Sequence, residues 1–160
     1  MTDAAQPTRR APGLSLKGRA LRYLSAREHS RAELTRKLAA HAETPEQLVQ
    51  VLDELQAKDF ISEARVADSV VNRRAAKFGA ARIRHELQGK GLSPERIADA
   101  VSALKTTELS RAREVWRRKF TEPALDAAGR AKQIRFLAAR GFGGDVIRRV
   151  VAGSKDEEEH

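Results

Sequence analysis

Arginine and lysine side chains give this chain its clearest binding chemistry, because each can neutralise a phosphate of a nucleic acid or an acidic group of a partner. Eight of them form the candidate contact set for DNA or a partner protein: Arg73, Arg74, Lys77, Arg82, Arg84, Arg113, Arg117 and Arg118. The first five flank one expected turn between two helices. Arg113 and Arg117 are four residues apart and therefore share a helix face. The alternative for any one of them is that it solvates its helix or pairs with an acid such as Glu114, a surface contact worth less than about 1 kcal/mol.

The positive charge is concentrated in one part of the chain. Residues 1–72 carry 11 basic and 10 acidic side chains, whereas residues 73–149 carry 19 basic and 8 acidic ones, a net charge of +11. Residues 150–160 carry one basic and four acidic side chains. A basic block within a folded region indicates a polyanionic partner, and nucleic acid is the most common one.

One aromatic pair stands among these cations. Trp116 and Phe120 are four residues apart on an expected helix, so they share a face. Such a pair can stack on bases, as in proteins that bind single strands. We expect them instead to pack inside their own helical unit, which is otherwise short of large apolar residues.

No pattern in the chain predicts catalysis, a metal or a cofactor. There is no cysteine, and the four histidines, expected to be surface histidines on helices, lack the spacing of a zinc site. The glycines within 141–144 lack the preceding strand and following Gly-Lys-Ser/Thr of a phosphate loop. We therefore expect a protein that is not an enzyme. The four histidines are His29, His41, His85 and His160.

Three copies of one pattern organise the chain. Leu38, Leu87 and Leu137 mark equivalent positions, spaced by 49 and 50 residues. Further apolar residues follow each leucine after ten and fourteen residues, and the spacings of three and four within each copy are those of a helix face. The other columns of the pattern contain Leu48, Ile97 and Ile147; Leu52, Val101 and Val151; Leu55 and Leu104; and Leu34, Ile83 and Gln133.

Each copy contains two helices joined by a capped turn, with a further helix before them. The turn of the second copy, Gly89-Lys90-Gly91-Leu92-Ser93-Pro94-Glu95, has a glycine stop, a serine cap and proline at the first helical position. The preceding helices are expected at Leu16–Ala26, Ser62–Lys77 and Glu108–Phe120, with Ser30 and Ser62 as N-caps.

The predicted fold is all-α: three tandem three-helix repeats stacked into an elongated, curved body. No segment alternates with the period of a strand or approaches the roughly 20 apolar residues of a membrane span. We expect a soluble, cytoplasmic monomer. The expected segments are a disordered leader at 1–14, repeats at 15–61, 62–106 and 107–153, and an acidic tail at 154–160.

Two longer motifs lie within the second and third copies. They are Lys77-Phe78-Gly79-x-x-Arg82-Ile83-x-x-Glu86-Leu87-x-x-Lys90-Gly91-Leu92 and Phe136-Leu137-x-x-Arg140-Gly141-Phe142. With these motifs, the repeats resemble the RecX family of bacterial regulators of the RecA recombinase. The resemblance covers about residues 15–153, and the first motif is its most specific stretch. The chain departs from the family pattern at Ala80, where proline is common, and at Asp59, where a glycine usually precedes the aromatic residue.

The resemblance implies a non-catalytic protein without a cofactor. Such a protein binds the RecA–DNA filament in its helical groove and modulates, mostly by inhibition, recombinase, ATPase and co-protease activity in recombination, DNA repair and the SOS response. It contacts single- or double-stranded DNA directly or within the filament. Two other classes stay open: a free-standing helical DNA-binding protein, and a scaffold whose repeats bind only protein. Against the first, no helix offers the base-reading residues of a recognition helix.

Overall fold

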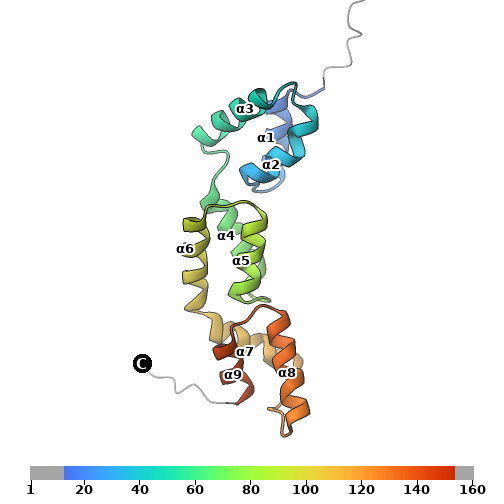
Figure 1. Ribbon diagram of the computed structural model, residues 1–160, viewed down its shortest axis with the longest axis vertical. Coiled ribbons are helices and arrows are strands. Elements are labelled where there is room, and N and C mark those ends of the chain that lie inside the picture. The colour runs from blue at the N-terminus through green and yellow to red at the C-terminus, as the bar shows by residue number, and fades with distance from the viewer. Residues whose placement is uncertain (1–12, 154–160) are drawn as a thin grey trace, which may run out of the picture. The chain divides into compact units, whose positions relative to one another are not determined.

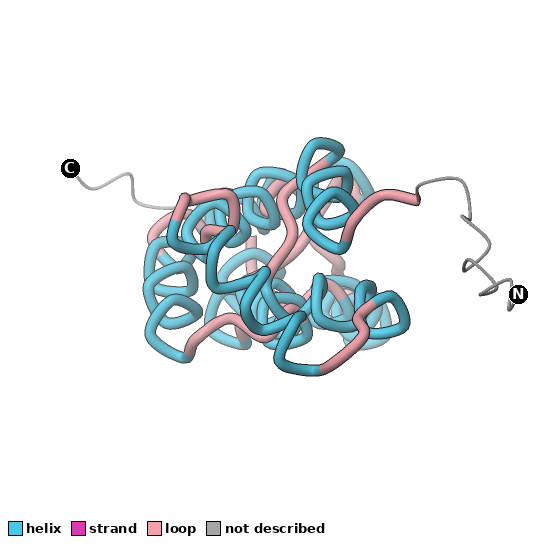
Figure 2. The backbone as a smooth tube through the Cα atoms, turned by 90° about the horizontal axis from the view of Figure 1, so that it is seen from above, coloured by secondary structure: helices cyan, strands magenta, loops and turns pink. Residues whose placement is uncertain are grey.

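A computed structural model describes residues 13–153, and every regular element in that range is helical (Figure 2). Most of the expected leader and the whole expected acidic tail lie outside the described residues. The chain divides into two compact units, unit 1 ending at Ser62 and unit 2 beginning at Glu63. The expectation of an all-helical protein is confirmed.

Among its described residues, 13–62, unit 1 contains three α-helices and one short 3₁₀ turn (Figure 1). Ser15 and Thr44 each cap a helix by accepting a hydrogen bond from a backbone N–H three residues on. Ser30 forms a complete capping box with Glu33, as its sequence spacing predicts. The elements are α1 (Leu16–Ala26), α2 (Arg31–Leu38), η1 (Ala39–His41) and α3 (Pro45–Ala57).

The described part of unit 2, residues 63–153, contains six helices, which form two triplets (Figure 1). The turn before the third helix has the predicted chemistry: Gly91 adopts a φ of 71°, and the Ser93 hydroxyl accepts from the Arg96 N–H. The helix α4 begins one residue after Ser62, whose capping role stays a prediction. The helices are α4 (Glu63–Arg74), α5 (Ala80–Gly89), α6 (Pro94–Lys105), α7 (Glu108–Lys119), α8 (Ala127–Ala139) and α9 (Gly144–Val151).

Each helix triplet encloses its own hydrophobic core, and the repeated leucine is at its centre. Leu38, Leu87 and Leu137 are each 0% exposed. The other apolar columns of the repeat are buried too, which confirms the alignment. The polar member, Gln133, is buried because its side chain accepts from Trp116 Nε1 at 3.1 Å and donates to the Glu122 carbonyl at 3.1 Å.

The two triplets of unit 2 are joined by backbone contacts at the start of α5. The Gly79 N–H donates to the Arg140 carbonyl at 2.8 Å, and the Ala81 N–H donates to the Gly141 carbonyl at 3.2 Å. The C-terminal end of α8 therefore meets the N-terminal end of α5, so the free carbonyls of one helix satisfy the free amides of the other. Helix α7 adds the buried Glu108, whose carboxylate accepts from the Ala80 N–H at 3.0 Å.

The expectation of surface histidines is wrong for His29. Its ring is 1% exposed and lies between α1 and α2 rather than on a helix. Lys37 Nζ lies 2.9 Å from its Nε2, and because an ammonium group can only donate, Nδ1 carries the hydrogen and donates to the Arg27 carbonyl at 3.1 Å. The connection between α1 and α2 buries this histidine, which helical periodicity does not reveal. His41 and His85 are exposed, and His160 lies outside the described residues.

Candidate nucleic-acid interface

Two of the predicted contact residues lie over the aromatic ring of Phe78. The guanidinium carbon of Arg82 lies 4.1 Å from the ring centroid, and that of Arg74 lies 5.8 Å from it. A surface pocket of about 260 Å³ opens beside them. Arg74 and Arg82 lie eight residues apart on two helices, so the turn between α4 and α5 brings them together. The pocket is lined by Arg74, Phe78, Arg82, Ile83, His85 and Glu86.

Arg111 holds the turn that carries Phe78. Its guanidinium donates to the carbonyls of Ala75 and Phe78, both at 2.8 Å, and to the Leu104 carbonyl at 3.0 Å. Burial lowers the pKa of the Arg111 guanidinium, and the Glu108 carboxylate acts in the opposite direction. From the sequence, Arg111 belongs with the basic residues available for phosphate contact. The structure assigns its hydrogen bonds to the protein itself.

The Arg82 side chain also reaches across the junction of the two triplets. One guanidinium nitrogen donates to the Ala139 carbonyl at 3.3 Å, close to where Gly79 and Ala81 bind the end of α8. In Figure 1, the beginning of α5 accordingly lies beside the end of α8. Arg82 thus has a fixed position over Phe78 while its side chain stays exposed.

A second cation–aromatic group lies at the end of α8. The Arg140 guanidinium carbon is 3.7 Å from the Phe136 ring centroid, and Lys119 Nζ is 5.8 Å from it. The eight contact residues predicted from the sequence do not include Arg140 or Lys119. The sequence contains a usable signal, because Phe136 and Arg140 repeat the four-residue spacing of Phe78 and Arg82. In both pairs the guanidinium lies over the ring.

The eight predicted residues separate into two groups in the structure. Five belong to the end of α4, the following turn and α5, and three belong to α7. Arg74 pairs with Glu86 at 3.3 Å and Arg117 with Glu114 at 2.6 Å, while Arg113 is half-buried and engaged with other groups. Within residues 13–153 the remaining exposed cations of the set have no acidic partner; apart from Arg82, they are Arg73, Lys77, Arg84 and Arg118.

The pair Trp116 and Phe120 packs inside the third triplet, as expected. Trp116 is half-buried and its indole N–H binds the buried Gln133. The Phe120 ring meets the Phe136 ring edge-on, with centroids 5.2 Å apart. These contacts use the two rings for packing rather than for stacking on bases.

Neither a metal-binding cluster nor a membrane-spanning helix occurs among the described residues. No three histidine, aspartate or glutamate side chains in residues 13–153 lie close enough together to hold a metal ion. Over the same residues, each helix is too short or too polar to cross a bilayer. This surface presents exposed cations, and one of them, Arg82, lies over the half-buried ring of Phe78. Such a surface suits electrostatic contact with an anionic partner.

Fold and surface together define an all-helical protein of three tandem three-helix domains. Family models for the first, second and third three-helix domains of RecX match residues 17–55, 62–101 and 106–151. The regulatory protein RecX of Leptothrix cholodnii is 58% identical over 149 residues, which are 93% of this chain and 95% of that protein. The regulatory protein RecX of Herminiimonas arsenicoxydans is 51% identical over 91% of this chain and 97% of that protein.

A solved structure shares the fold. The crystal structure of RecX from Lactobacillus salivarius has a TM-score of 0.76 and 20% identity, and the match covers 86% of this chain and 92% of that one. The chain belongs to the RecX family, a family of regulatory proteins rather than of enzymes.

Proposed function

We propose that this protein binds the RecA–DNA filament and regulates it, mainly by inhibiting strand exchange, ATP hydrolysis and the co-protease function. The observation that carries the proposal is membership of the RecX family over nearly the whole chain. In this proposal, the protein acts as a cytoplasmic monomer that contacts DNA directly or within the filament.

The surface of unit 2 supports this role. Arg73, Lys77 and Arg84 are exposed and have no acidic partner in the described residues. They can therefore bind a polyanion without breaking an ion pair within the protein. Arg82 is held over Phe78 and bonded to the neighbouring triplet, which reduces the conformational entropy lost when it contacts a phosphate. The same cations suit the phosphates of DNA in a filament or an acidic protein surface.

The test is RecA's ATPase on single-stranded DNA, measured while the purified protein is titrated in. We expect substoichiometric to stoichiometric amounts to reduce both ATP hydrolysis and strand exchange. Circular dichroism of the same preparation provides the folding control. Unchanged RecA activities in the presence of folded protein would refute the proposal.

The alternative function is that of a free-standing DNA-binding protein. The observation that favours it is the cation-lined pocket at Phe78, which needs no RecA to meet a phosphate. Binding to labelled DNA with and without RecA separates the two functions. Saturable binding to naked DNA that RecA does not strengthen, together with unchanged RecA activities, would favour the alternative.

A further inference from the structure

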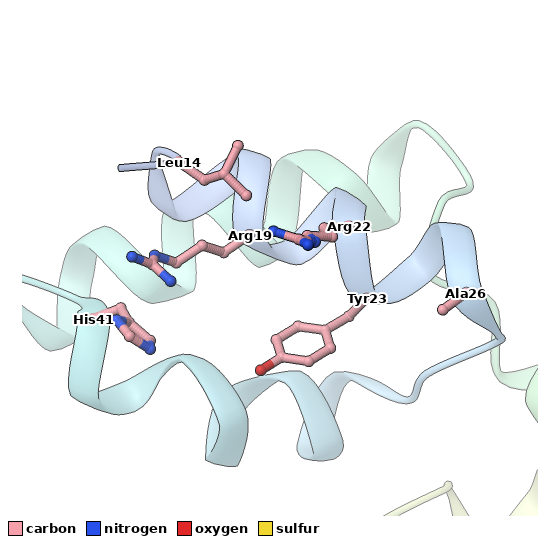
Figure 3. A pocket seen from close by; sticks show the side chains of 6 residues that line it. All are labelled: Leu14, Arg19, Arg22, Tyr23, Ala26 and His41. Atoms are coloured by element: carbon pink, nitrogen blue, oxygen red, sulfur yellow. The ribbon is translucent and has the colours of Figure 1, made fainter. Parts of the chain in front are cut away.

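Unit 1 contains a pocket that the distribution of charge along the sequence does not predict. It has a volume of about 350 Å³ and lies between α1 and the η1 turn. Figure 3 shows the Arg19 side chain reaching from α1 toward His41, with the Tyr23 ring projecting beside them. The pocket is lined by Leu14, Arg19, Arg22, Tyr23, Ala26 and His41, and none of these residues is acidic.

The cations of unit 1 differ in whether they have an acidic partner. Outside the pocket, Lys17 pairs with Glu54 at 2.6 Å, Arg27 with Glu33 at 2.8 Å and Arg31 with Asp53 at 2.6 Å. The two arginines of the pocket, in contrast, have no acidic partner within residues 13–153. Although positive and negative charges nearly balance in this unit, Arg19 and Arg22 therefore form a local pair of positive charges without an acidic partner in residues 13–153.

Arg19 and Arg22 are three residues apart on the same face of α1, where like charges repel each other. An anion bound between them would relieve this repulsion. Guanidinium groups have planar donor geometry that matches phosphate oxygens. The exposed His41 adds a further ring nitrogen to the same opening.

Tyr23 gives the pocket an aromatic wall. Its ring is half-buried and held in place by Lys37 Nζ, 4.7 Å from the ring centroid, and by the His29 ring at 5.5 Å. Leu14, which is 47% exposed, adds apolar surface to the pocket. An aromatic ring beside two arginines provides stacking for a base and charge for its phosphate, the combination found in sites for single-stranded nucleic acid.

We infer that this pocket is a second nucleic-acid site, which takes one nucleotide unit of a single strand with its base against Tyr23 and its phosphate between Arg19 and Arg22. The volume of about 350 Å³ is at the lower end of the range for small-molecule sites, roughly 300–1,000 Å³, and exceeds what a bare anion needs. The site goes beyond the proposed interface, which lies in unit 2.

The sequence supplies a direct reporter, because Tyr23 is the only tyrosine and Trp116 the only tryptophan. The experiment uses full-length protein with isotope-labelled tyrosine and tryptophan, titrated with thymidine monophosphate and followed by NMR. We expect saturable shifts of the Tyr23 ring resonances and small shifts of the Trp116 indole N–H in unit 2. A short oligothymidylate should produce the same pattern at lower concentration, since neighbouring phosphates add contacts.

Three further probes define the ligand class. Thymidine without phosphate, inorganic phosphate and a tetraglutamate peptide should each shift Tyr23 only weakly. Equal or stronger binding of phosphate alone would reduce the site to an adventitious anion contact and overturn the inference. Equal binding of the peptide would also overturn it, because the pocket would then suit acidic protein surfaces.

Matched variants remove the same charge from different places. Arg19→Gln with Arg22→Gln should weaken nucleotide binding by about tenfold or more, the effect of losing a charge-assisted hydrogen bond. Arg31→Gln with Lys58→Gln removes two cations that already have acidic partners in unit 1 and should change affinity by less than about twofold. Equal losses of nucleotide affinity in the two variants would show that affinity depends only on net charge, and would overturn the inference.

The measurement contains no RecA, so its outcome is independent of the proposed regulation. If Tyr23 does not respond to the nucleotide while the protein still inhibits the RecA ATPase, the pocket inference fails and the proposed function stands. If Tyr23 responds to the nucleotide but the RecA ATPase is unchanged, the pocket inference stands and the proposed function fails.

Discussion

Gly79 approaches Gly141 so closely that a Cβ atom at position 79 would lie 2.3 Å from the Gly141 carbonyl oxygen. The obstacle is backbone, which cannot rotate away as the end of a flexible side chain can. Gly141 itself has a φ of 85°, and a Cβ atom there would lie 2.6 Å from Arg82 Cβ. The contact between the second and third triplets therefore requires glycine on both sides.

Gly79→Ala is expected to destabilise unit 2. The added methyl group must push α5 away from the end of α8, which breaks the Gly79–Arg140 hydrogen bond at a cost of about 1–3 kcal/mol in unfolding free energy. Gly89→Ala is the matched control, because a Cβ atom at position 89 meets nothing within 4 Å and alanine favours a helix. Urea unfolding of both variants measures the difference. Equal stabilities would contradict the close packing at Gly79.

Ala80→Pro is expected to destabilise unit 2, although proline suits the first position of a helix. The substitution removes the N–H that donates to Glu108 at 3.0 Å and leaves a buried carboxylate oxygen without this donor, at a cost of roughly 1–3 kcal/mol. In a Glu108→Ala background the same proline should cost much less. A double-mutant cycle of unfolding free energies measures this coupling. Additive effects would show that the two groups do not interact.

Asp59→Gly is expected to stabilise unit 1. Asp59 is the only non-glycine residue with positive φ in residues 13–153, at 64°, and it follows the end of α3. The left-handed conformation is strained for residues with a Cβ atom, so glycine should raise the unfolding free energy by about 0.5–1 kcal/mol despite its freer unfolded chain. Thermal unfolding compares it with Asp59→Ala, which should be less stable than the wild type. A glycine variant less stable than the alanine variant would contradict this account.

The sequence predicted the helices and the core because both depend on local periodicity. The leucine column of residues 38, 87 and 137 marks three buried positions, and the Ser93-Pro94 cap begins a helix as expected. The departure at Asp59 is also explained, because that position requires the left-handed conformation that glycine adopts most easily.

The binding surface was less predictable, because charge along a sequence does not show which cations are already used. Arg111 counts as one positive charge, yet it binds three carbonyl groups of its own protein. Arg19 and Arg22 stand in a nearly neutral part of the sequence, yet no acid lines their pocket. Only the tertiary fold decides which charges meet.

Arg73, Lys77 and Arg84 should together contribute to the salt dependence of DNA binding. All three are exposed and have no acidic partner in the described residues. Replacing them with alanine should flatten the slope of log affinity against log salt by about two to three units, since each phosphate contact contributes roughly 0.7–0.9. Fluorescence anisotropy on labelled DNA at several salt concentrations measures the slope. The control variant carries alanine at Arg31, Lys58 and Arg148, which are paired with acids. A slope that changes equally in both variants would show that Arg73, Lys77 and Arg84 act only through the net charge of the protein and not through phosphate contacts of their own.

His29 should make unit 1 sensitive to mild acid. Burial, followed by the positive charges of Arg27 and Lys37, lowers the pKa of its imidazole below the ordinary value of 6.5, although its hydrogen bond to the Arg27 carbonyl opposes the shift. Above pH 6.5 the ring is neutral in both the folded and the unfolded chain, so its full contribution to stability is present. As the pH falls below 6.5, the unfolded chain binds a proton that the folded chain resists. The unfolding free energy should then fall, by at most about 1.4 kcal/mol per pH unit, until the pH passes the lowered pKa of the folded state.

Urea unfolding between pH 7.5 and 5 checks this expectation, with the single tyrosine, Tyr23, reporting on unit 1. His29→Gln should be less stable at pH 7.5 because it loses a buried ring, and its stability should depend less on pH in this range. His41→Gln is the control, because His41 is exposed in the same unit and its replacement should keep the wild-type slope. A slope that survives in His29→Gln would assign the acid sensitivity to another group. Its loss in that variant alone would assign the acid sensitivity to the buried His29 imidazole.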